Sequence, residues 1–244
     1  GVRGVLRHYR PNLHESTMRP LNFQKLVLNI SQQRLVALSD RATDMKNAFA
    51  WHLFNTALAE SLYPSLQMAE LALRNQIDHA LSIHTDRPDW FHAQLRLAPN
   101  QDARLKNLIH ELALQGRLAT NGSVVSALPF GFWTGFFNKF HAQSGLGHKL
   151  ARQVFMNAKP FQRDLRSLDS RWTQLRILRN RVFHHERIVH RTDLSATHSM
   201  LVETIHWMSP ELGWMSSRVD RFNSVFATAL QPWLEHVHGW SWVP

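Results

Sequence analysis

Apolar residues recur every three or four positions along most of this chain, which is the spacing of an amphipathic helix. The pattern is clearest in the segments "SLQMAELALRNQIDHALSIH" (65–84) and "LRSLDSRWTQLRILRNRVFHHERIVHR" (165–191). Alternation with a period of two is scarce, and the sequence contains no glycine-rich phosphate loop. The pattern therefore predicts an all-α protein.

Prolines and polar clusters interrupt this pattern. Residues 1–30, with Pro11 and Pro20, are expected to form a partly irregular N-terminal arm, and residues 31–244 a single domain. Helices are expected over about 31–62, from a new start at Pro64, and over 99–115. The candidate helix caps are Ser39, Asp40, Asn100 and Asp102.

Three later segments complete the expected fold. The stretch "GRLATNGSVVSALPF" (116–130) is expected to be a loop, and "GFWTGFFNKFHAQ" (131–143) an aromatic helix in the core. The chain after residue 195 is expected to form two further helices.

The most polar part of the long second segment is "LRNRVFHHERI" (178–188). At about 100° per residue, one side of this helix is apolar and the opposite side is polar. The apolar residues are Leu175, Leu178, Val182 and Val189, and the polar ones are Arg176, Asn180, His184 and Arg187, with Arg179 next to them. His185 falls at the edge of the apolar side, so we expect it to be a packed histidine with one hydrogen bond.

The same Arg-Asn-x3-His arrangement occurs earlier in the chain, in "LRNQIDHAL" (73–81). Its helix has an apolar side of Leu66, Leu73 and Ile77, and an opposite side of Arg74, Asn75 and His79. Glu70 stands one turn before Arg74 and is expected to pair with it. An ordinary polar helix face is one interpretation of this first motif, and a supporting element beside the second motif is the other. In the second motif three arginines crowd one histidine, which is costly unless an anion binds.

The second motif suits cleavage of RNA. Histidine exchanges protons near neutral pH, and an arginine fork matches the oxygens of a phosphate. RNA supplies its own nucleophile, the 2′-hydroxyl, so neither a metal nor another cofactor is required. We therefore expect Arg179, Asn180 and His184 to be catalytic and Arg176, Arg187, Arg74 and Asn75 to bind substrate, with Glu70 and His185 in support.

Composition and charge favour a globular protein with a polyanionic partner. The 244 residues are 44% apolar, and 28 Lys and Arg against 18 Asp and Glu leave a net charge of +10. Such an excess favours nucleic acid first and a membrane surface second. There is no cysteine, no apolar run long enough to span a membrane and no signal-peptide core, which is consistent with the cytoplasm.

Other chemistries fit the sequence less well. In "HERIVH" the two histidines are five residues apart, whereas a zinc-protease helix needs four. No carboxylate cluster lies near to hold magnesium, and "LPFGFW" has no serine for a nucleophile elbow.

These residues resemble a known family. The segment "LRNRVFHHERI" is similar to the signature helix of the Abi-like (abortive infection) proteins of the HEPN superfamily, whose mark is Arg, four to six residues, then His. The segments "ISQQRL", "AWHLFN", "LQMAELALRNQIDHAL", "LPFGFWTGFF" and "HWMSPEL" also stand in the family's order, so the likeness runs over about residues 29 to 240.

The resemblance implies a HEPN-like helical bundle with additional helices and a metal-independent endoribonuclease. It also implies a homodimer in which two Arg-x4-His helices form one cleft, and a role in phage defence or as a toxin. A neutralising partner would fit that role. Some HEPN toxins carry a modifiable Tyr two residues after the histidine; here that position is Glu186, which puts control by that route in doubt.

Two other functions remain open at this point. The chain fits a non-catalytic module that binds RNA or protein on the same basic face. It also fits a protein interaction domain built on the aromatic segments "FGFWTGFF" and "GWSWVP", although Trp and Phe are more often core residues.

Overall fold

The computed structural model describes residues 20–38 and 44–243, and they form two compact units. Unit 1 comprises the described parts of Gly1–Pro64, Asn180–His198 and Val219–Pro244, and unit 2 comprises Ser65–Arg179 and Ser199–Arg218. Both units are discontinuous in sequence. The sequence predicted one domain over residues 31–244, and this stays a prediction.

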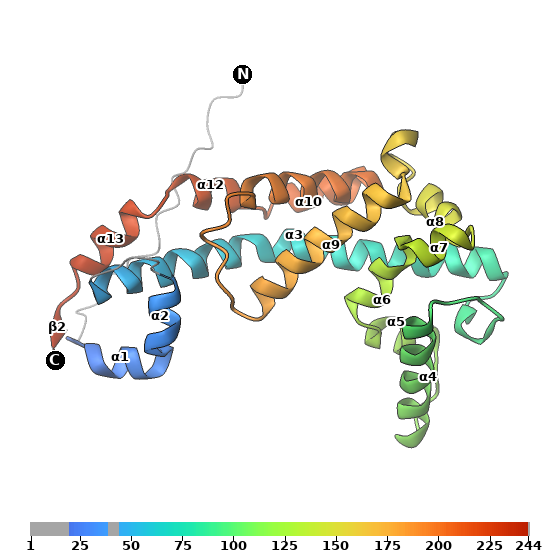
Figure 1. The fold of residues 1–244 in the computed structure, drawn as a ribbon, viewed down its shortest axis with the longest axis horizontal. Coiled ribbons are helices and arrows are strands. Elements are labelled where there is room, and N and C mark those ends of the chain that lie inside the picture. The colour runs from blue at the N-terminus through green and yellow to red at the C-terminus, as the bar shows by residue number, and fades with distance from the viewer. Residues whose placement is uncertain (1–19, 39–43, 244) are drawn as a thin grey trace. The chain divides into compact units, whose positions relative to one another are not determined.

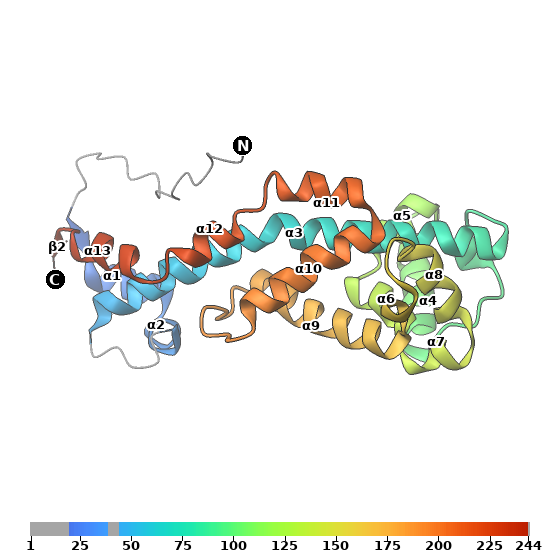
Figure 2. The same ribbon diagram turned by 90° about the horizontal axis from the view of Figure 1, so that it is seen from above.

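Unit 1 is built around the first part of the long helix α3 (Met45–Thr85). The helices α12 (Phe222–Ala227) and α13 (Gln231–His238) run along this part of α3 (Figures 1 and 2). Two pairs of aromatic rings show the packing. The ring centroids of Phe54 and Trp233 lie 6.2 Å apart, and those of the stacked rings of Phe49 and Trp242 lie 5.4 Å apart. The C-terminal segment of the described chain therefore packs on the first part of α3.

The N-terminal part of unit 1 contains a short strand and two helices. Strand β1 (Leu21–Asn22) pairs in parallel with β2 (Trp242–Val243), and α1 (Phe23–Ile30) and α2 (Gln32–Leu38) follow β1. The sequence predicted a partly irregular arm over residues 1–30; residues 1–19 of this arm lie outside the described residues, and residues 23–30 form a helix. The Asn22 side chain caps this helix by accepting a hydrogen bond from Lys25 N at 2.8 Å.

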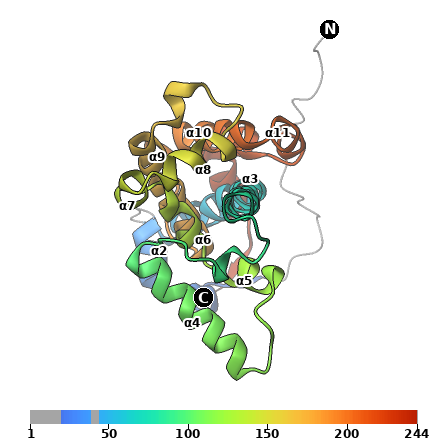
Figure 3. The same ribbon diagram turned by 90° about the vertical axis from the view of Figure 1, so that its right-hand side faces the viewer.

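Unit 2 gathers short helices around the second part of α3 (Figure 3). Its core contains the aromatic residues that the sequence predicted to be buried, among them Trp133, Phe136 and Phe137. The other elements of unit 2 are η1 (Trp90–His92), α4 (Pro99–Leu114), α5 (Asn121–Ala127), α6 (Phe130–Thr134), η2 (Gly135–Phe137), α7 (Lys139–Gln143), α8 (Leu146–Val154), η3 (Pro160–Arg163) and α11 (Pro210–Ser217). Helices α9 (Leu165–Phe183) and α10 (Leu194–Met208) belong partly to each unit, because the division falls after Arg179 and after His198.

Several predicted element boundaries are wrong. Pro64 does not start a helix but lies inside α3, where a proline removes one main-chain hydrogen bond. Residues 121–127, expected in a loop, form α5, because Thr120 and Ser123 make a capping box. The aromatic helix is divided into α6, η2 and α7, and the N-cap position of α4 is Ala98, whose side chain makes no capping hydrogen bond, rather than Asn100 or Asp102. The proposed caps Ser39 and Asp40 lie outside the described residues.

The all-α prediction is confirmed for the described residues, whose only sheet is the pair of two-residue strands. Among these residues, no helix has both the length and the apolarity that a membrane crossing requires.

Candidate functional site

Helix α9 carries the second Arg-Asn-x3-His motif at its C-terminal end (orange in Figure 1). Leu175, Leu178 and Val182 are buried, as the helical spacing predicted. On the other sides of the helix, Arg179 is half-buried and Asn180 is exposed. The apolar stripe therefore holds the helix in place and leaves its polar end accessible.

Arg179 is held by the carboxylate of Glu70, which lies on α3 one turn before the first motif. Its Nε donates to Glu70 Oε2 at 3.0 Å and its Nη2 to Glu70 Oε1 at 3.4 Å, so that the guanidinium fork faces both oxygens. The two side chains are 26% and 23% exposed, which protects the pair from most of the solvent. A charge-assisted pair with this geometry fixes the direction of the arginine.

This contact corrects the expected pairing of Glu70 with Arg74. Glu70 forms an ion pair with Arg179 of α9 instead of with Arg74, which follows Glu70 by one turn on the same helix. Arg74 is half-buried, and its Nε has no hydrogen-bond partner among the described residues. The helix that carries the first motif therefore contacts the second motif, because Glu70, one turn before Arg74, orients Arg179.

Helix α9 ends earlier than the sequence pattern indicated. His185 adopts a left-handed conformation with φ of 56°; its N–H donates to Val182 O, and the N–H of Glu186 donates to Arg181 O at 2.8 Å. These two bonds form a Schellman motif, whose left-handed position is usually occupied by glycine. His184 is consequently the C-cap residue, with its N–H donating to Asn180 O at 2.9 Å and its side chain exposed.

The helix end overturns the predictions that extended the helical wheel past residue 183. His185 is exposed and not packed. Val189 is only half-buried, and Ile188 takes the buried position instead. Arg187 lies in the loop, where its Nη1 donates to Ala37 O at 2.5 Å, so it does not belong to the helix face that carries Asn180.

Asn55 of α3 anchors the loop that follows α9. Its Oδ1 accepts hydrogen bonds from the main-chain N–H groups of Ile188 at 2.8 Å and Val189 at 3.1 Å. Its Nδ2 donates to Glu186 O at 3.3 Å. Asn55 is buried, and the sequence pattern assigned it no role. An amide on the apolar side of α3 was a signal, because a buried polar side chain needs hydrogen-bond partners.

The remaining predicted substrate-binding residues lie in unit 2. Arg176 of α9 packs over α6, with its Nη1 3.5 Å from the position that a Cβ on Gly131 would occupy. Asn75 and His79 are exposed on α3. Among the described residues, no three His, Asp or Glu side chains are grouped so that they could hold a metal ion.

Comparisons of the chain with family models, with curated proteins and with solved structures find no match. The site is therefore interpreted from its own residues.

Proposed function

We propose that this protein is a metal-independent endoribonuclease whose catalytic residues are Arg179, Asn180 and His184. The observation that carries the proposal is the exposed end of α9. His184 is the C-cap residue there, Asn180 stands one turn before it, and both are open to solvent while the opposite stripe is buried.

Arg179 supplies the second part of the proposed site. Its guanidinium is preoriented by Glu70, which reduces the entropy lost when an arginine binds a phosphate. Glu70 also offsets part of the arginine's charge. We infer that RNA phosphate competes with Glu70 for the fork, or shares it through the remaining N–H groups, since a guanidinium has five of them.

The proposed reaction is transfer within the RNA strand. The 2′-oxygen forms a bond to phosphorus, the bond from phosphorus to the 5′-oxygen breaks, and the strand ends as a 2′,3′-cyclic phosphate. One histidine accepts the 2′-hydroxyl proton, and a second donates a proton to the leaving 5′-oxygen. Arg179 and Asn180 stabilise the negative charge that develops on the phosphate oxygens.

Two histidines with opposite roles are most simply supplied by two copies of the chain. We propose a two-fold homodimer in which each copy contributes one His184, because a single imidazole does not serve as acid and base in the same step. The resemblance of this motif to Abi-like HEPN proteins, and the net charge of +10, support RNA as the substrate. The resemblance also supports a HEPN-like bundle and a role in phage defence or as a toxin, and the absence of cysteine fits a cytoplasmic setting.

The test is incubation of the purified protein with single-stranded and structured RNA, with and without EDTA. We expect cleavage in both conditions and products with 2′,3′-cyclic phosphate ends. Analytical ultracentrifugation at micromolar concentration should show a dimer. Cleavage that EDTA abolishes, or a monomer that cleaves RNA at full rate, would contradict the proposal. Binding of RNA without any cleavage would favour a non-catalytic RNA-binding module instead.

A further inference from the structure

Half of the net positive charge of the chain lies in one segment of unit 2. Residues 139–171 contain seven Lys and Arg against two Asp, a net charge of +5, whereas the whole chain has +10. This segment forms α7, α8, η3 and the beginning of α9. Such a concentration of charge is typical of a surface that binds a polyanion.

The outer side of α8 carries part of this charge. The buried side of the helix has the usual helical spacing, with Leu146, Leu150 and Val154 in the core. The opposite side is exposed and presents Lys149 and Arg152. Within the described part of the chain, neither of these two side chains forms an ion pair or a hydrogen bond.

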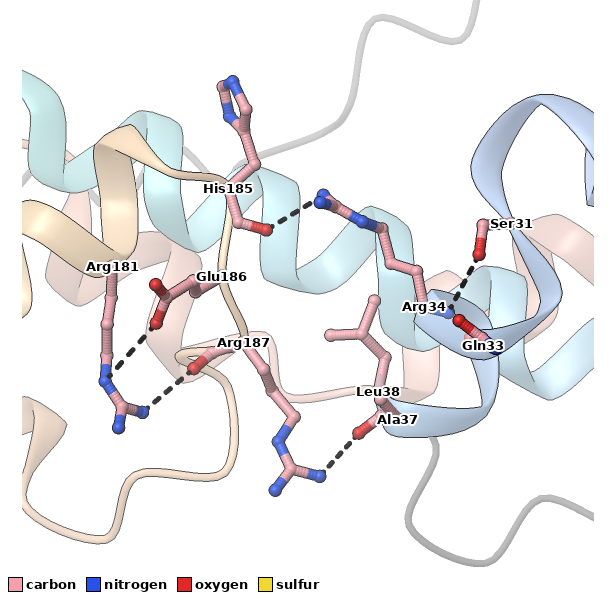
Figure 4. Close-up of a pocket in the computed structure, with 9 residues that line it drawn as sticks. All are labelled: Ser31, Gln33, Arg34, Ala37, Leu38, Arg181, His185, Glu186 and Arg187. Atoms are coloured by element: carbon pink, nitrogen blue, oxygen red, sulfur yellow. Dashed lines mark hydrogen bonds and ion pairs between the residues drawn. The ribbon is translucent and has the colours of Figure 1, made fainter.

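The basic side chains of α8 differ in this respect from arginines of unit 1. There, Arg34 donates to the main-chain oxygen of His185 at 3.0 Å, and the Arg181 guanidinium lies 3.9 Å from the Glu186 carboxylate (Figure 4). Those arginines hold the loop that follows α9. The cations of α8 hold no other described part of the chain, so they are available to a ligand.

Asp164 connects α8 with the beginning of α9. Its Oδ2 accepts hydrogen bonds from the N–H and the hydroxyl of Ser167 at 2.9 and 3.0 Å. These bonds, and less strongly the positive charges of Arg166 and His148, lower the pKa of Asp164. His148 of α8 and Arg166 of α9 are therefore both close to this carboxylate. The exposed sides of the two helices, with Lys149, Arg152 and Arg166, form the basic surface.

A pocket of about 510 Å³ adjoins the basic surface at Arg166. It lies beside η3, between residues 166–174 of α9 and residues 200–207 of α10. Pockets for small ligands measure about 300–1,000 Å³, so this one can admit a nucleotide. Aromatic rings, hydroxyl groups and amides line this α9–α10 pocket, from Phe161, Trp207, Ser167, Ser170, Gln162 and Gln174.

Arg171 holds the α10 side of the pocket in position. Its Nη2 lies 2.8 Å from Glu203 Oε2, and its Nη1 donates to Met200 O at 3.1 Å. The guanidinium also lies over the ring of Trp207, 3.9 Å from the ring centroid. These contacts join α9 to α10 and place the charge of Arg171 against a carboxylate. The pocket is therefore formed before a ligand binds.

Phe161 gives the pocket an exposed aromatic ring. Its side chain is 73% exposed, and its ring contacts no other aromatic ring of the described residues. A ring in this position is a platform on which a nucleic-acid base can stack. Gln162 Nε2 and Gln174 Oε1 form no hydrogen bond in the described chain, and together they offer a donor and an acceptor to the edge of a base.

We propose that this face of unit 2 binds single-stranded RNA, with one unpaired base stacked on Phe161 in the α9–α10 pocket and backbone phosphates on Lys149 and Arg152. The choice of RNA rests on the function proposed above, whereas the combination of a stacking ring with unpaired cations rests on the surface itself. A duplex binds less well, because its bases are already stacked and do not reach Phe161.

An anionic membrane is the other partner that attracts Lys and Arg. The pocket favours RNA over a lipid, because its hydroxyl and amide groups suit the polar edge of a base and not an acyl chain. Stacking and phosphate contacts hold a strand with little regard to its sequence. The surface therefore positions RNA and does not select a cleavage sequence.

The decisive variants are Phe161→Leu, which keeps an apolar side chain without a ring, and Phe161→Tyr, which keeps the ring. Phe161 is exposed, so neither change disturbs the core. Both are made in full-length His184→Ala protein to prevent cleavage. Binding of a fluorescent single-stranded RNA, and of the same strand in a duplex, is followed by anisotropy.

We expect Phe161→Leu to lower affinity for the single strand about tenfold, within the range that stacking on one aromatic ring provides. Its affinity for the duplex should stay within about twofold of the parent protein, because no base stacks on the ring there. Phe161→Tyr should stay within about twofold for both RNAs.

The charges are tested with Lys149→Ala/Arg152→Ala. This change should reduce the slope of log affinity against log salt by about 1.4 for the single strand, because each phosphate contact contributes about 0.7. The matched control, Lys106→Ala/Arg117→Ala, removes the same charge from exposed positions on α4 and just after it. The control should leave the slope nearly unchanged.

Three outcomes would overturn the proposal. Equal changes of slope in the two double variants would mean that only net charge matters. Full affinity of Phe161→Leu for the single strand would mean that no base stacks on this ring. Binding to vesicles of phosphatidylcholine and phosphatidylserine that Phe161→Leu retains, without affinity for RNA, would make this face a membrane-binding surface.

The same experiments separate this proposal from the proposed catalysis. Normal RNA cleavage by the wild-type chain, together with unaltered RNA affinity of Phe161→Leu and Lys149→Ala/Arg152→Ala, would reject the RNA-binding surface alone. Absence of cleavage by the wild-type chain, together with the expected losses in these variants, would reject the catalysis alone.

Discussion

The two Arg-Asn-x3-His motifs are close copies in sequence but have different structural roles. The first, from Arg74 to His79, lies within the second half of a 41-residue helix, with its histidine exposed on a regular helix face. The second begins at Arg179 near the end of α9, and its His184 is the C-cap residue. The same residue spacing therefore occurs in two different local structures.

The difference arises from what surrounds each motif. After His79 the helix continues to Thr85, so the histidine remains one of several polar residues on its surface. After His184 the left-handed residue His185 stops the helix, and Asn55 holds the following loop. A helix end exposes main-chain groups and side chains that a helix interior does not, which makes the second motif the better candidate for chemistry.

The largest expected effect distinguishes the two histidines. His184→Ala should reduce RNA cleavage by about 10²–10⁴-fold, which is the usual contribution of acid–base catalysis. His79→Ala should stay within about twofold of wild type, with both proteins melting close to wild type because both side chains are exposed. Cleavage rates and melting temperatures measured side by side provide the test. Equal losses for both variants would remove the distinction between the motifs.

The next effect concerns the arginine fork. Arg179→Lys should lower the cleavage rate by about 10²-fold, comparable to losing one donor to a developing negative charge. A lysine keeps the charge but not the paired N–H groups that face Glu70 and the substrate. Single-turnover kinetics at saturating RNA measures this directly. A lysine variant with wild-type rate would show that a point charge is sufficient.

The third prediction concerns the stability that the ion pair between Glu70 and Arg179 provides. Glu70→Gln should lower the free energy of unfolding by about 1–3 kcal/mol, because it removes a charged partner from a half-buried arginine. Glu111→Gln is the control, since its pair with Arg104 is 3.8 Å long and exposed, and it should cost less than about 0.5 kcal/mol.

Double-mutant cycles then identify the partner of Glu70. Denaturant unfolding should show coupling of about 1 kcal/mol between Glu70→Gln and Arg179→Gln. Coupling between Glu70→Gln and Arg74→Gln should be close to zero. A reversed result would mean that Glu70 pairs within its own helix, as the sequence alone indicated.

The smallest effect tests the helix end and is expected to have opposite signs in the two motifs. His185→Gly should stabilise the protein by about 1 kcal/mol, because glycine adopts the left-handed conformation without strain. His79→Gly should destabilise it by about 1 kcal/mol, because glycine is unfavourable inside a helix. Thermal unfolding of both variants measures the difference. Destabilisation by His185→Gly would mean that the helix does not end there.

Several features of this protein follow from the sequence by itself. Helical periodicity identified the all-α class and the two buried stripes, Leu66, Leu73 and Ile77 in one helix and Leu175, Leu178 and Val182 in the other. These predictions hold because burial of every third or fourth residue is a local requirement, and the residues that satisfy it are neighbours in the chain. The candidate residues Arg179, Asn180 and His184 were identified from local spacing in the same way.

Other features were decided only by tertiary structure. The sequence pattern predicted that the helix continues past Phe183 and includes Arg187 and Val189. The sequence has no glycine at the position where the helix ends. Asn55, more than a hundred residues away, accepts hydrogen bonds from the main-chain N–H groups of Ile188 and Val189. These bonds stabilise the loop relative to a continued helix. Glu70 likewise forms its ion pair with Arg179, although Arg74 is its neighbour on the same helix. Helix ends and ion pairs depend on competition between partners, and folding brings in partners from distant parts of the chain.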